Sequence, residues 1–203
     1  MWSKTPLRLV KSARSGAADD ISDDDLMLLA ATGRQDAFEV LVRRHQSLVF
    51  ALACRFLGDK SLGRDVTQEV FLALWAERNR YQAQDRFKGY LVSMTLHRCH
   101  ATTRNNKNYL SRMVGLARES EVAGPTADLP LDLLLEREKR LQVRQALLKL
   151  PEKYRQVLIL RFTHGFALEE ISKLLKSPLG TVKSSVFRGL KKLQMLLPQE
   201  KAK

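Results

Sequence analysis

The sequence contains little cysteine and no long apolar run. Only two cysteines, Cys54 and Cys99, occur among 203 residues, and they lie far apart in the chain. Two distant thiols do not make a disulfide framework, and the chain has neither a secretory h-region nor an apolar run long enough to span a bilayer. These absences predict a cytoplasmic protein with reduced thiols and no membrane insertion.

Motifs for catalysis are also missing. The sequence has no P-loop, no Gly-rich nucleotide-binding fingerprint, no His-Glu-x-x-His pair and no Ser/His/Asp order. His97, Cys99 and His100 are close in sequence, but neighbouring residues on a helix point in different directions, and no second Cys/His pair completes a tetrahedral set. We therefore predict no catalytic residue, no metal site and no cofactor, in a protein that is not an enzyme.

The net charge is strongly positive, because 35 Lys and Arg residues oppose 22 Asp and Glu residues. A charge of +13 favours a polyanionic partner, since basic side chains release counterions from phosphates. Residues 137–203 contain 16 basic and 5 acidic side chains, residues 19–77 contain 6 and 11, and residues 86–112 contain 6 and none. One acidic and two basic segments predict at least two partner surfaces.

Apolar residues recur at intervals of three and four while strand signals are weak, which predicts an all-α fold. Ser22, followed by three aspartates, is a candidate N-cap for a first helix that Gly33 ends. Asp36 is a candidate cap for a second helix that ends near Gly58. Further helices are predicted at about residues 63–78, 87–103, 131–149, 152–163, 167–176 and 181–197.

Glycine, proline and small residues interrupt the helical pattern between residues 114 and 130, as expected of a linker. The prediction is two small helical domains joined by a flexible linker. The ranges are a disordered N-terminal tail at residues 1–21, a first domain at 22–112, the linker at 113–130 and a second domain at 131–198.

Two apolar stripes near the C-terminus have the spacing of a helix-turn-helix. The first contains Leu168, Ile171, Leu174 and Leu175, and the second contains Val182, Val186, Leu190 and Leu193, all of which we expect to be buried. The other side of the second helix carries Lys and Arg, which can hold phosphates or read guanine, and a Phe that can touch a thymine methyl. An ordinary helical hairpin with a solvated basic face has the same pattern, but the positive charge of this segment favours DNA.

Residues 150–162, LPEKYRQVLILRF, followed by Gly165, Glu169-Glu-Ile and Gly180-Thr-Val-Lys-Ser, resemble region 4 of extracytoplasmic-function (ECF) sigma factors. The resemblance implies a helix-turn-helix that docks in the major groove of the −35 promoter element. The implied contacts are Thr181, Lys183, Ser184, Phe187, Arg188 and Lys192. Ser185 and Leu190 stand where the family often has Arg, which implies fewer phosphate contacts or a shifted sequence preference.

Residues 65–75, DVTQEVFLALW, resemble the region 2 signature that binds the clamp helices of the polymerase β′ subunit. Their apolar positions are expected to face the core. A second stripe remains at helical spacing, and the resemblance implies that it binds polymerase: Asp65, Gln68, Glu69 and Leu72. A plain solvated face would carry the same polar residue types.

Residues 81–106 resemble the part of region 2 that reads the −10 element, with a loop followed by Phe87-Lys-Gly-Tyr-Leu at the start of a helix. Holding unstacked bases requires aromatic rings and cations. The implied contacts are Tyr81, Lys88, His97, Arg98 and Arg104. Phe87 and Tyr90 are expected to be core residues, and His97 stands where the family usually has Asn, which leaves the preferred −10 base open.

The resemblance covers about residues 22–112 and 131–197. It implies a non-catalytic alternative sigma factor that joins core RNA polymerase, at the β′ clamp helices and the β flap, to promoter DNA, and that an anti-sigma factor controls. One alternative is a helix-turn-helix regulator that acts without polymerase, which would not need the stripe within residues 65–75. Another is a nuclease or hydrolase acting on nucleic acid, which would need clustered carboxylates or metal ligands.

Overall fold

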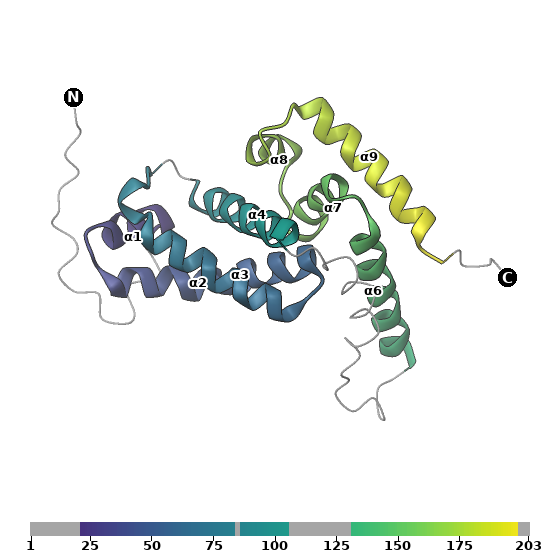
Figure 1. Ribbon diagram of the computed structural model, residues 1–203, viewed down its shortest axis with the longest axis horizontal. Helices are drawn as coiled ribbons and strands as arrows, with labels where there is room; N and C mark the ends of the chain where they lie inside the picture. The colour runs from purple at the N-terminus through teal and green to yellow at the C-terminus, as the bar shows by residue number, and fades with distance from the viewer. Residues whose placement is uncertain (1–20, 84–85, 106–130, 199–203) are drawn as a thin grey trace.

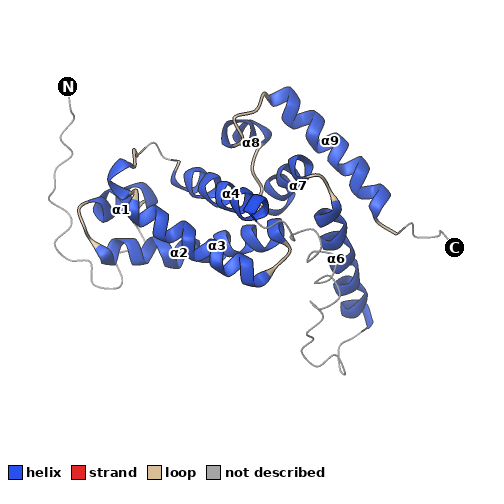
Figure 2. Ribbon diagram, viewed as in Figure 1, coloured by secondary structure: helices blue, strands red, loops and turns tan. Residues whose placement is uncertain are grey.

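The computed structural model describes residues 21–83, 86–105 and 131–198, and these residues form helices and no strand (Figures 1 and 2). The elements are α1 (Asp23–Ala31), α2 (Gln35–Leu57), α3 (Lys60–Ala76), the short η1 (Arg78–Arg80), α4 (Phe87–Asn105), α6 (Leu131–Lys149), α7 (Glu152–Leu158), the π-helical turn η2 (Ile159–Thr163), α8 (Leu168–Leu174) and α9 (Leu179–Leu196). The all-α prediction is confirmed. The predicted linker, and the predicted tail up to residue 20, lie outside the described residues.

The first helix begins where its sequence predicts. Ser22 caps α1, because its Oγ accepts a hydrogen bond from the backbone N–H of Asp25 at 3.1 Å. The predicted cap of α2 is wrong: this helix begins at Gln35 after the extended residue Arg34, so Asp36 already lies inside the first turn. There its carboxylate pairs with the Arg34 guanidinium, with 2.9 Å between Nε and Oδ1.

The predicted start of α3 at Gly63 is also wrong. Asp59 caps this helix, since its Oδ1 accepts hydrogen bonds from the N–H groups of Ser61 at 2.6 Å and Leu62 at 3.0 Å. Gly63 instead lies at the contact between α2 and α3. A Cβ atom on Gly63 would stand 2.4 Å from the Sγ of Cys54, which is far closer than van der Waals contact. Only a residue without a side chain lets the two helices approach this closely.

Helices α1 to α4 form one part of the molecule, and α6 to α9 form another (Figure 1). In the first part α2 packs against α1, α3 and α4. Its core is apolar, and the largest fully buried side chains are Phe56, Phe87, Leu26, Met27, Leu41, Leu52, Leu57, Leu74 and Leu91. Burial of Phe87 confirms its expected place in the core.

The second part contains the predicted helix-turn-helix, formed by α8 and α9. The Glu170 carboxylate accepts a hydrogen bond from the Ala167 N–H at 2.6 Å, and the Ser172 hydroxyl donates to the Ser177 carbonyl at 2.6 Å. These bonds fix the start of α8 and the turn that follows it. Ile171 on α8 is fully buried, which anchors the pair of helices to the rest of this part.

The prediction that Leu190 belongs to the buried stripe of α9 is wrong, because its side chain is 42% exposed. Gly189, the residue before it, is buried against α7: a Cβ on Gly189 would lie 3.2 Å from a Leu158 methyl carbon and 3.3 Å from the Tyr154 Cβ. Because Gly189 has no side chain, α9 lies close to α7 at this residue. The centre of the contact is therefore Gly189 and not Leu190. Leu190 lies one residue, or about 100°, around the helix from that centre.

The two parts pack against each other around Phe56 of α2, which is fully buried. The Arg155 guanidinium carbon lies 4.9 Å from the centre of the Phe56 ring, and the His100 ring meets Phe56 edge-on with 5.1 Å between centroids. His100 of α4 also pairs with Glu152 of α7, and its Nε2 lies 3.1 Å from the Gln156 Oε1. The described residues therefore form a closed arrangement in which α7 covers the ends of α2 and α4.

Further contacts extend this closed arrangement along α4 and the end of α2. The Lys88 ammonium lies 5.3 Å from the centre of the Phe166 ring, and the Arg144 guanidinium donates a hydrogen bond to the Gly58 carbonyl at 3.0 Å. The predicted domains are thus in direct contact in the structure.

The contact between Gly63 and Cys54 generates a stability prediction. Gly63→Ala should lower the free energy of unfolding by about 1 to 3 kcal/mol, the usual cost of overpacking, although Ala favours a helix by about 1 kcal/mol over Gly. Urea unfolding followed by circular dichroism measures the change. Adding Cys54→Ala removes the sulfur atom and should restore part of the loss.

Gly180→Ala is the matched control, because nothing lies within 4 Å of a Cβ at that position of α9. It should leave the urea midpoint unchanged or raise it. Equal losses in Gly63→Ala and in the double variant would contradict the proposed clash with the Cys54 sulfur.

Candidate nucleic-acid and partner-binding surfaces

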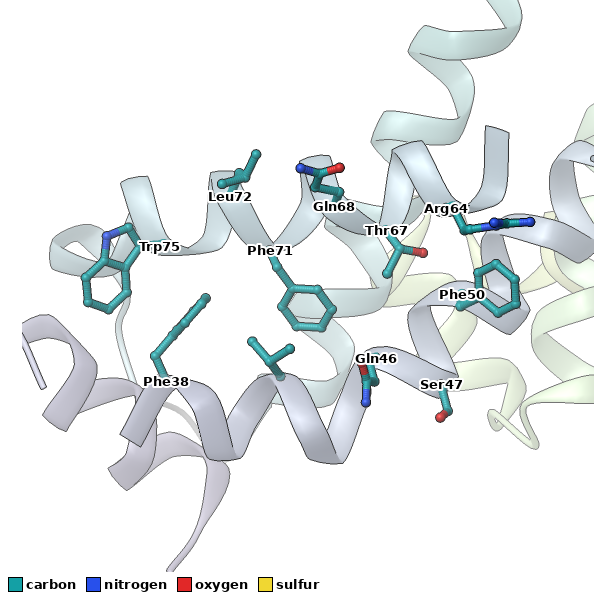
Figure 3. A pocket seen from close by; sticks show the side chains of 11 residues that line it. Phe38, Gln46, Ser47, Phe50, Arg64, Thr67, Gln68, Phe71, Leu72 and Trp75 are labelled. Atoms are coloured by element: carbon teal, nitrogen blue, oxygen red, sulfur yellow. The ribbon is translucent and has the colours of Figure 1, made fainter. Parts of the chain in front are cut away.

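A groove of about 670 Å³ runs between α2 and α3 (Figure 3). Its walls are mostly carbon, and it is lined by Phe38, Val42, Gln46, Ser47, Phe50, Arg64, Thr67, Gln68, Phe71, Leu72 and Trp75. The ring of Phe38 lies 5.0 Å from that of Trp75 and 6.5 Å from that of Phe71, so aromatic rings from both helices form one end. An open apolar groove of this kind can accept an apolar face of a partner helix.

The structure brings half of the predicted polymerase-binding stripe to this groove. Gln68 and Leu72 line it, and Leu72 is 61% exposed. Asp65 and Glu69 are exposed on the same helix but are not among the lining residues. All four side chains are accessible, as the prediction requires.

Sequence reasoning missed the wall that α2 contributes. The apolar residues of α2, among them Phe38 and Val42, form one broad face in the sequence pattern that predicts burial in the core, but both side chains are only half-buried and line the groove. The available signal was the width of that face, which exceeds what one core contact needs.

The predicted −10 residues do not form a single cluster. Lys88 and His97 are nine residues apart on α4, which places them on opposite sides of the helix. Lys88 faces the second part through Phe166, whereas His97 is exposed and shares its side with the exposed Arg104. Arg98 is half-buried between these two sides.

Tyr81 lies where the chain leaves η1, and its side chain turns inward. Its hydroxyl donates a hydrogen bond to Oδ1 of Asp24 at 2.7 Å, and its ring lies 5.9 Å from Phe87 and 5.4 Å from Tyr90. Burial, together with the Asp24 carboxylate, raises the pKa of Tyr81 above its usual value. The hydroxyl therefore stays protonated and remains a donor throughout the physiological range.

The predicted −35 residues lie on α9, and most of them are exposed. Phe187 is 71% exposed, Ser184 is half-buried, and Thr181, Lys183, Arg188 and Lys192 are exposed. Together with Lys191 they give α9 four cationic side chains and no acidic one. A helix with one packed face and one exposed cationic face can enter a major groove without losing its contact with the protein.

No group of three or more His, Cys, Asp or Glu side chains in the described ranges is arranged to hold a metal ion. No described helix combines the length and apolar character needed to cross a membrane.

Family comparison matches residues 41–109 to Sigma-70 region 2 and residues 140–193 to Sigma-70, region 4. The ECF RNA polymerase sigma factor SigW of Bacillus subtilis (strain 168) is 30% identical over 171 residues, which cover 81% of this chain and 91% of the relative. The ECF RNA polymerase sigma-E factor of Escherichia coli (strain K12) is 32% identical over 185 residues, which cover 85% and 92%.

Solved structures share the fold. CnrH in complex with the cytosolic domain of CnrY has a TM-score of 0.60 at 24% identity, covering 86% of this chain and 96% of CnrH. The sigma factor RpoE of Bartonella quintana, in complex with the anti-sigma factor NepR, has a TM-score of 0.60 at 20% identity, covering 81% and 98%. With both regions matched in order and relatives aligned over most of their length, the chain belongs to the ECF sigma factors of the sigma-70 family, which direct promoter-specific transcription.

Proposed function

We propose that this chain is a non-catalytic initiation subunit that acts in the cytoplasm, binds core RNA polymerase through the groove between α2 and α3, and holds the −10 and −35 promoter elements. The groove is the observation that carries the proposal. A helix-turn-helix regulator that works without polymerase needs only a surface such as that of α9, and has no use for an apolar groove on a separate part of the chain.

The groove suits a helical partner such as the β′ clamp helices. Its apolar lining supplies a surface that a partner helix can remove from water, and the exposed Gln68 among its lining residues can make polar contacts. Binding energy in such interfaces is concentrated in a few large apolar side chains, which here include Leu72 and Trp75. The β flap is proposed as a second polymerase contact of region 4.

We also propose the functional boundaries 22–112 for region 2, 113–130 for the connection and 131–198 for region 4. The complex of Bartonella quintana RpoE with the anti-sigma factor NepR supports a further proposal, that an anti-sigma factor binds this chain. Run-off transcription with core polymerase on genomic fragments, with and without the protein, tests the function as a whole. Transcripts that do not depend on the protein would contradict it.

The first prediction from this function concerns the groove. Leu72→Glu puts a charge where the partner helix buries an apolar surface, so it should weaken binding to core polymerase by at least about tenfold. Leu28→Glu is the matched control, because Leu28 is also an exposed leucine but lies on α1 outside the groove. A pull-down with β′ clamp helices measures both. Equal binding by the two folded variants would contradict the assignment of the groove.

A second prediction separates base reading from phosphate binding on α9. Arg188→Ala should lower use of the preferred −35 sequence selectively, by about 1 to 3 kcal/mol if the guanidinium contacts a guanine. Lys192→Ala should weaken matched and scrambled −35 sites alike and reduce the slope of log affinity against log salt by about 1. Binding measured on both sequences across a salt series distinguishes the two. Equal weakening of both sites by Arg188→Ala would show that its role is electrostatic only.

The third prediction concerns the closed arrangement, which cannot hold both elements of one promoter. Their centres are about 25 base pairs, or about 85 Å, apart, whereas α4 and α8 are in contact. The 25 residues between α4 and α6 can extend to about 85 Å. Energy transfer between dyes at Lys60→Cys and Lys149→Cys, two exposed positions beside the contact of Gly58 with Leu148, should therefore be high in the free chain and fall on binding to polymerase and promoter.

The two buried or half-buried native cysteines are replaced by Ala in these labelled chains, which are first checked for unchanged transcription. Leu148→Asp charges a side chain that lies against Gly58, so it should lower energy transfer in the free chain as well. Transfer that stays the same in the free and promoter-bound chain would contradict the separation.

A further inference from the structure

Among the described residues of the connection from η1 to α4, the side chain of Tyr81 makes a long-range hydrogen bond to the protein. The hydroxyl donates to Asp24 across 57 positions of the chain, at 2.7 Å. The acceptor lies in the first turn of α1 and is only 9% exposed, so the bond is a charge-assisted one largely shielded from water. Bonds of this type are stronger than those between neutral groups.

The acceptor is itself held in place. The neighbouring Asp23 pairs with Arg44 at 2.7 Å and lies 2.7 Å from the Nε2 of His45, and Arg44 also donates to the carbonyl of Ile21 at 2.8 Å. These contacts tie the start of α1 to α2, the central helix of this part. Tyr81 is therefore attached, through Asp24, to a support that cannot shift independently of the core.

The ring of Tyr81 extends this attachment to α4. It lies against Phe87 and Tyr90 in the first turns of that helix, and Phe87 lies 5.3 Å from His45. On the other side, the backbone N–H of Tyr81 donates to the carbonyl of Arg78 in η1 at 3.3 Å. Tyr81 thus contacts both η1, where the connection begins, and the first turns of α4, the helix that carries His97 and Arg104.

We propose that Tyr81 is a positioning residue for reading the −10 element, and that its hydrogen bond to Asp24 makes α1 part of that apparatus. The proposal rests on the proposed function of this segment. It refines the role of Tyr81 as a direct contact, because the hydroxyl is already used within the protein. The match to Sigma-70 region 2 begins at residue 41, so the anchoring carboxylate lies outside the matched residues.

The mechanism separates two kinds of contact. Cations of α4 can hold phosphates whatever the sequence, whereas reading an unstacked base requires the connection to stay in one geometry. Loss of the anchor lets this connection sample other positions, which weakens base reading and leaves phosphate contacts intact. Preferred and non-preferred −10 sequences then become more alike.

The experiment compares Tyr81→Phe with Tyr90→Phe as a matched control. Both remove one hydroxyl from the same aromatic cluster, but the Tyr90 hydroxyl reaches only an exposed Glu77 at 3.4 Å. Run-off transcription is measured on a panel of −10 variants and on a template already opened across the −10 region. Tyr81→Phe should reduce the ratio between the best and worst −10 sequences by about tenfold, the effect of losing one charge-assisted hydrogen bond, while Tyr90→Phe keeps the ratio.

Asp24→Ala should reduce the discrimination between −10 sequences as much as Tyr81→Phe does, and the double variant should lose little more. Asp24→Asn keeps an acceptor oxygen and should therefore retain most of this discrimination. Amide hydrogen exchange at residues 78–83 reports the anchor without transcription, and should rise in Tyr81→Phe and Asp24→Ala but not in Tyr90→Phe. If Tyr81→Phe lowers all −10 variants and the opened template by one factor, or leaves exchange unchanged, the positioning role is overturned. Failure of the wild-type protein to support any transcription would instead contradict the proposed function.

Discussion

The contact between α2 and α3 determines where the other surfaces lie. The helices meet through Gly63 and Cys54 beside their connecting turn, and through the rings of Phe38 and Trp75 at the far end. A glycine at one end and aromatic rings at the other hold the pair in a wedge, so that the groove opens between them. Because α2 also packs on α4 and α1, and meets α6 and η2, a change in this wedge would move the groove, α4 and the contact with the second part together.

The contact between the two parts combines strong apolar burial with weak polar pairing. Phe56 is fully removed from water. Arg155 beside it is a nearly buried cation whose Nη1 donates to the Leu148 carbonyl at 3.1 Å, but among the described residues its Nε has no hydrogen-bond partner, which lowers the net stability of the contact. Burial, with Arg55 and Lys88 nearby, lowers the pKa of His164 to about 4, so near neutral pH this ring adds no positive charge there. An interface whose buried cation is only partly hydrogen-bonded can hold the free chain closed and still yield to a partner that binds each part more strongly.

Local rules of the sequence predicted the elements well and the contacts between them poorly. The cap at Ser22 and the turn between α8 and α9 depend on residues close in sequence, and both were confirmed. The sequence around Gly63 suggests that a helix starts there, because a glycine often marks the end of an element. The structure shows that this glycine is needed for close packing against Cys54 on another helix. The exposure of Leu190 and the bond of Tyr81 to Asp24 likewise depend on distant segments, which no periodicity within one helix can indicate.

In the proposed function, the closed arrangement treats the two DNA-reading surfaces differently. The cationic side of α9 stays exposed, whereas Lys88 of the −10 segment lies over Phe166. In this arrangement the free chain presents the cationic side of α9 together with the exposed His97 and Arg104 of α4, but the two parts are too close to bind both elements of one promoter, so its affinity for DNA is modest and salt-dependent. Once polymerase holds the two parts apart, one part can bind its promoter element while the other is already bound. The second binding step is then intramolecular and benefits from a high effective concentration. Promoter selectivity then depends on both surfaces acting together, because neither one alone makes enough contacts to select a site.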